Sequence, residues 1–173
     1  ALTSDTYTYI ALAQIFDTLV RIEEDGSISP WLAESWTVSE DGTEVVFQIR
    51  DGVVFHNGDP MTVDDVVYSL NRAIESPQTQ KFTAVFSGAE KDDEHSVKIT
   101  LPQAYAPLLY CIGNPCMGIV SQSAVEEYGE DFGRNPIGTG AYKFVDWTSG
   151  VEINLTRNDD WWGEPAANKD DTM

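Results

Sequence analysis

The chain has 173 residues, 42% of them hydrophobic and 11% aromatic, which suits one globular domain and is too short for two large ones. Its 29 acidic and 10 basic residues give a formal net charge of −19, which repels phosphate backbones and anionic membranes. We therefore expect no nucleic-acid partner. No apolar run approaches the roughly 20 residues that span a bilayer, so we expect no direct membrane insertion of this chain. The acids are scattered over many turns, which favours a solubilising coat over attraction of a cationic ligand.

The N-terminal part predicts a helix, a strand and two turns. Apolar residues recur at helical spacing over residues 5–19, so we expect a helix there. A short strand over 19–22 then ends at an acidic turn closed by Gly26. Pro30 suits the first position of a helical turn, which we predict over 31–35.

The segment that follows has the clearest strand pattern in the chain. Residues alternate in polarity over 36–39 and again over 45–50, which is the period of a strand with one buried face. Asp41-Gly42 lies between them and is a strong hairpin signal, because glycine tolerates positive φ. Two further turn signals, Asp51-Gly52 and Asn57-Gly58, flank one more short stretch in which apolar residues alternate. We predict a small antiparallel meander.

The best-specified helix comes next. Thr62 can cap it, and Asp65 occupies the third helical position as a carboxylate variant of the capping box. An apolar stripe follows, which predicts packing on a sheet, and Pro77 ends the helix. Asp64 and Asp65 look like a paired-carboxylate site, but acids in a first helical turn complement the helix dipole, and we prefer that interpretation.

The remaining elements alternate between strands and short helices. We predict strands over 85–90 and 96–101, a helix over 107–112, a helix capped by Ser121 or Ser123, and a last hairpin of 141–147 with 151–157. Residues 137–140, IGTG, precede a predicted strand, so no helix N-terminus is available there to hold a phosphate. We interpret this loop as a tight turn that lets two backbones approach.

No catalytic or metal framework is evident. The sequence lacks G-x-S-x-G, H-E-x-x-H, G-x-x-x-x-G-K and the dinucleotide fingerprint. A glycoside hydrolase would need only two carboxylates, but the spacing selects no pair. We predict no catalytic residue, no cofactor and no metal.

Cysteine and histidine are scarce. Cys111 and Cys116 lie in CIGNPC, while His56 and His95 are far away in sequence, so too few ligands gather for a metal. A local disulfide in an oxidising compartment and two buried thiols both fit the cysteines. We interpret His56, beside an Asn-Gly turn, as a partly exposed structural residue.

Three segments together carry a family resemblance. They are DGSISPWLAESWTVSEDGTEVVFQIRDGVVFHNGDPMTVDDVVYSLNRA, NPIGTGAYKFVDW and RNDDWWG, in this order. The chain resembles the family 5 extracellular solute-binding proteins, which are the receptors of ABC importers for oligopeptides, dipeptides, nickel chelates and similar solutes. The family usually has proline where this chain has Ala141.

The resemblance implies a protein about three times as long, whose two lobes close on a solute through a hinge. We expect a mixed α/β (α+β) fold with antiparallel-rich sheets and packed helices. Residues 1–173 would form a partial N-terminal lobe, with a β-meander/helix subdomain over about 34–157 and without the opening strand and the second lobe. The chain begins without an initiator methionine or a signal peptide, so we expect an excised fragment of a longer secreted protein.

The resemblance also implies solute contacts. In relatives the cleft is lined by the loop that enters the first helix, by an aromatic residue after the capped helix, and by the segment before GIVS. These positions fall on Ser4, Asp5, Thr6, Phe82, Cys116, Met117 and Gly118. Loop or core packing would also explain each of them. The acid that anchors a peptide's amino terminus in relatives belongs to the second lobe.

The implied function is that of an extracytoplasmic substrate-binding protein, in the periplasm or as a cell-surface lipoprotein. It would capture a peptide or other small solute and deliver it to the permease subunits of an ABC importer. Nickel chelates, haem and oligosaccharides stay open as solutes. The alternative is a surface carbohydrate-binding or adhesion module, because Trp161 and Trp162 could stack on sugars.

Overall fold

The computed structural model describes residues 6–163, with side chains from residue 10 onward. In chain order the elements are α1 (Thr6–Ile15), β1 (Val20–Ile22), β2 (Ile28–Pro30), β3 (Ala33–Val38), β4 (Glu44–Ile49), α2 (Val63–Glu75), α3 (Gln80–Thr83), β5 (Gly88–Lys91), β6 (Ser96–Thr100), α4 (Leu108–Ile112), η1 (Pro115–Met117), α5 (Gln122–Tyr128), η2 (Gly129–Arg134), β7 (Tyr142–Thr148) and β8 (Glu152–Arg157). Every strand pair among these residues is antiparallel. The predicted mixed α/β class is confirmed.

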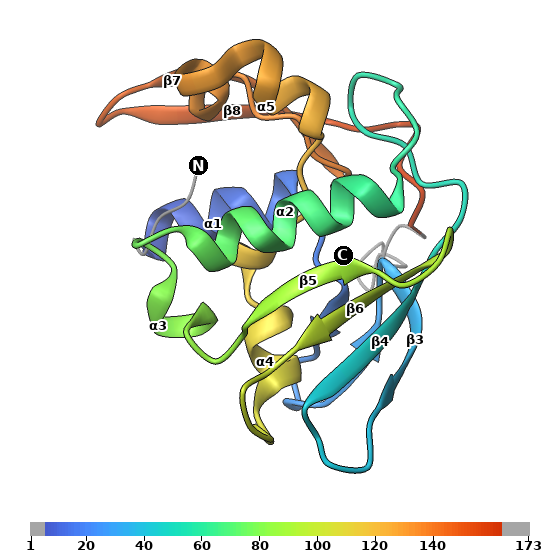
Figure 1. The fold of residues 1–173 in the computed structure, drawn as a ribbon. Coiled ribbons are helices and arrows are strands. Elements are labelled where there is room, and N and C mark those ends of the chain that lie inside the picture. Colours follow the sequence, from blue (N-terminus) through green and yellow to red (C-terminus); the bar gives the residue numbers. More distant parts are fainter. Residues whose placement is uncertain (1–5, 164–173) are drawn as a thin grey trace.

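The elements form layers around α2. One layer is a four-stranded sheet in the order β3-β4-β6-β5, and α2 packs on it through contacts with β5 and β6. On the other side of α2 lie α5 and the β7–β8 hairpin, while β1 and β2 form a separate two-stranded sheet (Figure 1). Within the described residues, no helix is both long and apolar enough to cross a bilayer.

The hairpin around Asp41-Gly42 is confirmed, but the predicted meander is only partly right. β3 pairs with β4, and Gly42 adopts a φ of 69° in the turn. The next segment contributes only an isolated bridge between Val54 and Pro60, and the third strand of the sheet is β6. The backbones of Val53 and Phe55 instead bond to Met61 and Asp59 within the same loop.

The helical turn predicted over residues 31–35 is wrong. Residues 33–35 already belong to β3, where Ala33 pairs with Ile49. The backbone carbonyl of Leu32 accepts a hydrogen bond from Arg50, and both Leu32 and Ala33 are fully buried. Strand pairing and burial therefore override the weak helical signal that Pro30 gives.

The capped helix has the predicted start. Asp65 N–H donates to the Thr62 hydroxyl at 3.2 Å, and Thr62 N–H donates back to the Asp65 carboxylate at 3.0 Å. This reciprocal pair satisfies two donors that a helix N-terminus leaves free. The predicted capping box of Thr62 and Asp65 is thus confirmed, while the Asp64 carboxylate lies 3.4 Å from the Lys91 ammonium.

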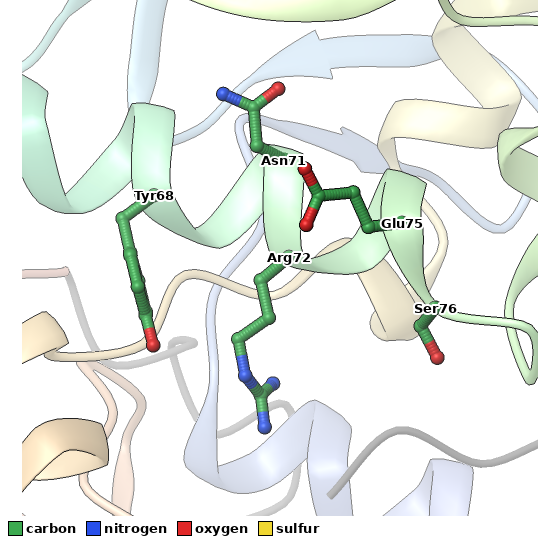
Figure 2. A pocket seen from close by; sticks show the side chains of 5 residues that line it. All are labelled: Tyr68, Asn71, Arg72, Glu75 and Ser76. Carbon is green, nitrogen blue, oxygen red and sulfur yellow. The ribbon is translucent and has the colours of Figure 1, made fainter.

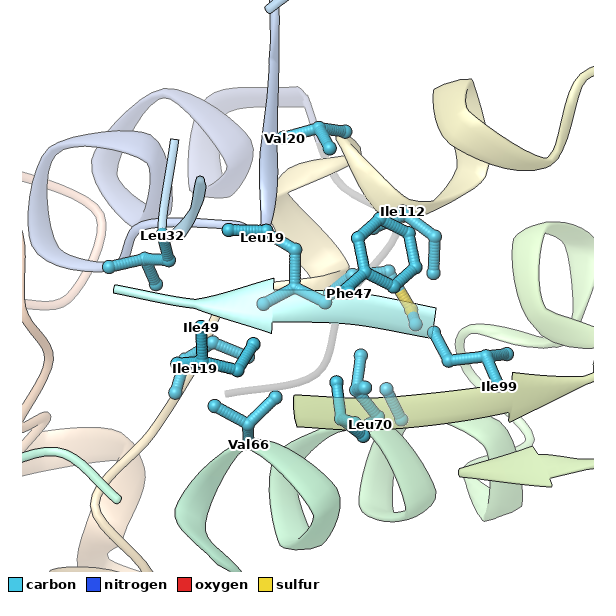
Figure 3. Close-up of a cluster of buried hydrophobic side chains, with 14 of the residues drawn as sticks. Leu19, Val20, Leu32, Phe47, Ile49, Val66, Leu70, Ile99, Ile112 and Ile119 are labelled. Carbon is cyan, nitrogen blue, oxygen red and sulfur yellow. The ribbon is translucent and has the colours of Figure 1, made fainter. Parts of the chain in front are cut away.

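Two apolar clusters hold the layers together. The larger one lies between the sheet and α2 and includes Phe47, Val66, Leu70 and Ile119 (Figure 3). The smaller one joins α1 to α5 and η2, and its buried members are Leu12, Ile15, Phe16, Val120, Ala124 and Phe132. Phe144 and Leu155 of the β7–β8 hairpin pack against the smaller cluster.

The IGTG loop is the close backbone approach that the sequence predicted. A Cβ atom on Gly138 would lie 2.1 Å from the carbonyl oxygen of Ile15, and one on Gly140 would lie 2.4 Å from that of Gln14. Neither oxygen can move freely, because both belong to the backbone of the α1 end. Any side chain at these positions would separate α1 from the loop.

We expect Gly138→Ala to lower the free energy of unfolding by about 2 kcal/mol or more, as for an overpacked core. Gly88→Ala is the matched control, because the nearest heavy atom to its Cβ would be 3.7 Å away, and it should preserve or slightly raise stability. Urea denaturation followed by tryptophan fluorescence measures both. Equal stability of the two variants would contradict this account of the loop.

Candidate functional site

The site is built on α2, whose first turn also fixes α5. Besides capping α2, the Asp65 carboxylate accepts a hydrogen bond from the backbone N–H of Gln122 at 3.0 Å. Gln122 is the first residue of α5, which Ser121 caps. One carboxylate therefore orients the starts of two helices.

Ser69 attaches the chain after η1 to the middle of α2. Its hydroxyl accepts from Val120 N–H at 2.9 Å and also lies 2.7 Å from the Asp65 carbonyl oxygen, to which it donates. Ser69 is buried within the apolar stripe of α2. Sequence analysis missed it, although a hydroxyl in such a stripe indicates a buried hydrogen bond.

Residues 114–118 are held between α1 and α2. The side chain of Asn114 caps η1 by accepting from Cys116 N–H at 3.1 Å, and η1 contacts both helices. A Cβ on Gly118 would lie 2.7 Å from Cβ of Phe16, so glycine is required for this close packing on α1. The segment is thus fixed from both sides.

A small pocket lies where α1, α2 and η1 meet. Its volume is about 20 Å³, which is room for roughly one water molecule. It is lined by Leu12, Phe16, Ser69, Arg72, Pro115, Cys116, Gly118 and Val120. By itself this pocket is too small for a peptide or a metal chelate.

A wider, open groove of about 510 Å³ runs along α2 and is lined by Tyr68, Asn71, Arg72, Glu75 and Ser76 (Figure 2). The Tyr68 and Arg72 side chains extend to the same side of the helix. The Asn71 amide is already used, because it donates to the Ala89 carbonyl at 2.7 Å and accepts from Ala89 N–H at 2.9 Å.

Arg72 and Glu75 supply opposite charges to this groove, and the Tyr68 ring gives it an apolar wall. The Arg72 guanidinium also lies 5.9 Å from the centroid of the Phe132 ring. Such an open polar groove can contact a solute but cannot enclose one. Among residues 6–163, no three His, Cys, Asp or Glu side chains gather closely enough to hold a metal ion.

The predicted contact residues fall on elements that meet around α2. Thr6 begins α1, and Phe82 lies in α3, which packs on α2. Phe82 is partly buried against the larger cluster, with the Lys81 ammonium 4.8 Å from its ring centroid. Ser4 and Asp5 lie outside the described residues.

Cys116 and Met117 point into the protein interior. Both side chains are buried in the larger cluster. Cys116 and Cys111 are free thiols rather than a disulfide, but only Cys116 is buried, so the predicted alternative of two buried thiols is only partly right. Burial raises the pKa of the Cys116 thiol to about 12, and the neighbouring Cys111 adds to this, while the charge of Lys81 opposes it.

Comparison with known proteins assigns the chain to a family. Residues 27–171 match the pattern of "Bacterial extracellular solute-binding proteins, family 5 Middle". The chain belongs to family 5. The predicted resemblance is confirmed over most of its length.

Individual relatives agree with this family 5 assignment. The chain is 27% identical to the glutathione-binding protein GsiB of Escherichia coli O1:K1, over 98% of this chain and 34% of GsiB. The periplasmic binding protein DppA of Helicobacter pylori, in complex with the peptide STSA, superposes with a TM-score of 0.85 at 29% identity, over 95% of this chain and 37% of DppA. NikZ of Campylobacter jejuni, in complex with Ni(L-His), superposes with a TM-score of 0.82 at 29% identity, over 94% of this chain and 34% of NikZ. The chain therefore spans about a third of the length of these relatives.

Family membership and structure both argue against the carbohydrate-binding alternative. Trp161 and Trp162 lie in an aromatic cluster with Trp31, whose ring centroid is 5.0 Å from that of Trp162. The indole N–H of Trp162 donates to the buried carboxylate of Asp17 at 3.0 Å, and both rings are only partly exposed. These rings pack on each other instead of forming a platform for sugars.

His56 anchors the IGTG loop in this family 5 chain. Its Nε2 atom lies 2.9 Å from the Gly140 carbonyl oxygen, and Gly138 N–H donates to Nδ1 at 3.4 Å. Only the neutral tautomer with the proton on Nε2 satisfies both contacts. Burial lowers the pKa of His56, Lys143 lowers it further, and the Gly140 contact and Asp17 oppose the shift.

Because the pKa of folded His56 is lowered, the unfolded chain binds the proton more readily, so stability should fall as the pH drops below the ordinary histidine value of about 6.5. We expect His56→Gln to lose less stability than wild type between pH 7 and pH 5. Urea titrations at pH 7 and pH 5 measure the free energy of unfolding. The same loss of unfolding free energy between the two pH values in His56→Gln and in wild type would refute this prediction.

Proposed function

We propose that the chain is one lobe of a substrate-binding protein of an ABC importer, which captures a peptide or a similar small solute between two lobes. The main support is that this chain has a family 5 fold, spans about a third of the length of its relatives, and has an open polar groove whose described lining comes from residues 68–76 alone. A solute would be bound when a second lobe covers this side of the chain. Closure would be driven by the tighter binding of the solute to the closed form.

Peptides are the favoured solute class. GsiB is a glutathione-binding protein, DppA holds the peptide STSA, and NikZ holds Ni(L-His), so all three ligands contain amino-acid units. Arg72 and Glu75 of the groove offer charges that complement both ends of such a ligand. A nickel chelate is the second solute to test, because the NikZ complex contains one.

We place the solute contacts of this lobe at Ser4, Asp5, Thr6, Phe82 and residues 116–118. Because the sulfur atoms of Cys116 and Met117 are buried, a solute would meet the backbone of this segment instead of its sulfur atoms. Phe82 would supply an apolar cover next to it. The location of the complete protein would be extracytoplasmic, in the periplasm or as a cell-surface lipoprotein, with the permease subunits of the importer as partners.

One lobe of a two-lobed binding protein contacts only one side of its solute and cannot bind that solute tightly. We expect the 173-residue chain to show no measurable affinity for tetrapeptides in isothermal titration calorimetry, whereas the complete protein binds one or more of them. A set that includes STSA, glutathione and Ni(L-His) covers the solutes of the relatives. Equal affinity of the chain and the complete protein would contradict the two-lobe proposal.

Phe82→Ala in the complete protein should raise the dissociation constant of the bound solute by about tenfold, which corresponds to about 1.4 kcal/mol of lost aromatic contact. Tyr128→Ala is the control, because Tyr128 is an exposed aromatic residue at the end of α5 and not a predicted contact. Calorimetry measures both constants. A Phe82→Ala protein that is fully folded and binds as tightly as wild type would remove Phe82 from the site.

A further inference from the structure

Arg72 lies between the open groove and the small pocket. Its side chain lines the groove of about 510 Å³ along α2 and also the pocket where α1, α2 and η1 meet. Cys116 and Gly118, which belong to the predicted solute segment, line the same small pocket. A group that Arg72 holds in the groove therefore lies next to the segment of residues 116–118.

The Arg72 guanidinium is not neutralised by a neighbouring carboxylate. Arg21, Arg50 and Arg157 each lie within 3.6 Å of an Asp or Glu oxygen. In the part of the chain that the structure describes, no such ion pair and no hydrogen bond joins the Arg72 guanidinium to another group. The Glu75 side chain, although it lines the same groove, extends away from this guanidinium (Figure 2). The positive charge of Arg72 is therefore available to an incoming anion.

Buried apolar side chains lie beneath this charge. The Arg72 guanidinium is 5.9 Å from the centroid of the Phe132 ring, and Phe132 is only 1% exposed. Leu12 and Phe16, which line the small pocket together with Arg72, are buried members of the same cluster as Phe132. Charges interact more strongly beside such side chains than in open water, because less water screens them. An anion on Arg72 is therefore held more firmly than an anion on a fully exposed arginine.

Tyr68 supplies a second donor on the same face of α2. It precedes Arg72 by four residues, which is the spacing that makes two side chains neighbours on a helix. Figure 2 shows both side chains extending to the same side of α2, with the phenol oxygen and the guanidinium at their outer ends. A guanidinium is a planar fork of donors that matches the two oxygens of a carboxylate, and a hydroxyl can donate to the same group. This arrangement favours a carboxylate over a spherical anion.

We propose that Arg72 binds the C-terminal carboxylate of a peptide solute, with the Tyr68 hydroxyl as an additional donor. The peptide then runs from the groove toward residues 116–118. This inference rests on the proposed function, because it names the part of the solute that this lobe recognises. It restricts the solute class to peptides with a free carboxyl end and excludes C-terminally capped peptides as tight ligands.

The acidity of the chain makes a local cation necessary for such a solute. A formal net charge of −19 repels a free carboxylate during its approach. At physiological ionic strength this repulsion is screened beyond about 8 Å, whereas a direct contact with a partly buried guanidinium is screened much less. Arg72 thus offsets the repulsion within the groove itself.

A purely structural role for Arg72 is the alternative. The guanidinium would then only pack on the Phe132 ring and hold η2 against α2. Loss of that packing would weaken the binding of every solute by the same factor. Loss of a carboxylate contact weakens only the solutes that carry the carboxylate. The ratio of two dissociation constants therefore separates the two roles.

The test compares the tetrapeptide STSA with its C-terminal amide by calorimetry on the complete protein. We expect wild type to bind the free acid at least about tenfold more tightly than the amide, and Arg72→Gln to bind both with dissociation constants within about twofold of each other. Tyr68→Phe should reduce the preference for the acid only in part. Arg134→Gln is the matched control, because the Arg134 guanidinium also lies over an aromatic ring, 4.9 Å from the centroid of Trp147, and it should keep the wild-type preference. If another tetrapeptide binds in place of STSA, its acid and amide form the pair.

Two results overturn the inference: a wild-type protein that binds acid and amide equally, and a folded Arg72→Gln protein that keeps the wild-type preference. Should Arg72→Gln not fold, Arg72→Lys replaces it, because it keeps the charge but loses the planar fork. The lysine variant should retain only part of the preference, and an unchanged preference overturns the inference equally.

The outcome for the proposed function is read from the same titrations. If the complete protein binds no peptide, the peptide function fails and this inference fails with it. If it binds peptides but the preference for the free acid is absent or independent of Arg72, the proposed function stands and only the role of Arg72 is refuted.

Discussion

The fold depends on a close contact between the end of α1 and the loop of residues 137–140. Gly140 N–H donates to the Ile15 carbonyl at 2.9 Å, and Gly138 lies where any side chain would collide with the same oxygen. Between the two glycines, the Thr139 hydroxyl donates to Asp17 at 2.9 Å. The backbones can come this close only because Gly138 and Gly140 have no Cβ atom, so these glycines set the distance between α1 and the β7–β8 hairpin that follows the loop.

Asp17 extends this contact to two further segments. Its buried carboxylate accepts from the indole N–H groups of Trp31 at 2.8 Å and Trp162 at 3.0 Å, in addition to Thr139. A buried charge is costly unless several donors surround it, and here three donors from distant parts of the chain do so. The carboxylate therefore fixes α1, the start of the sheet and the C-terminal segment relative to one another. Trp162, one of the two tryptophans considered as a sugar platform, is used for this purpose.

The surface that carries the proposed function is shallow because the elements around α2 are well packed against each other. Ser69, Asn114 and Gly118 leave only a water-sized pocket between α1, α2 and η1, while the groove along α2 stays open. A rigid, open wall of this kind suits a binding protein in which a second surface completes the site.

The sequence by itself determined the features whose cause lies within a few residues: the Asp41-Gly42 turn, the capping box of α2, the last hairpin and the tight glycine loop. It also determined the family, through three ordered segments. The tertiary structure alone decided that residues 33–35 join β3, that β6 supplies the third strand of the sheet, and that Cys116 and Met117 face the core. These outcomes depend on partners far away in the chain, since strand pairing and burial are settled by which surfaces meet, whereas turns and caps are settled by the allowed φ and ψ angles and by hydrogen bonds between near neighbours.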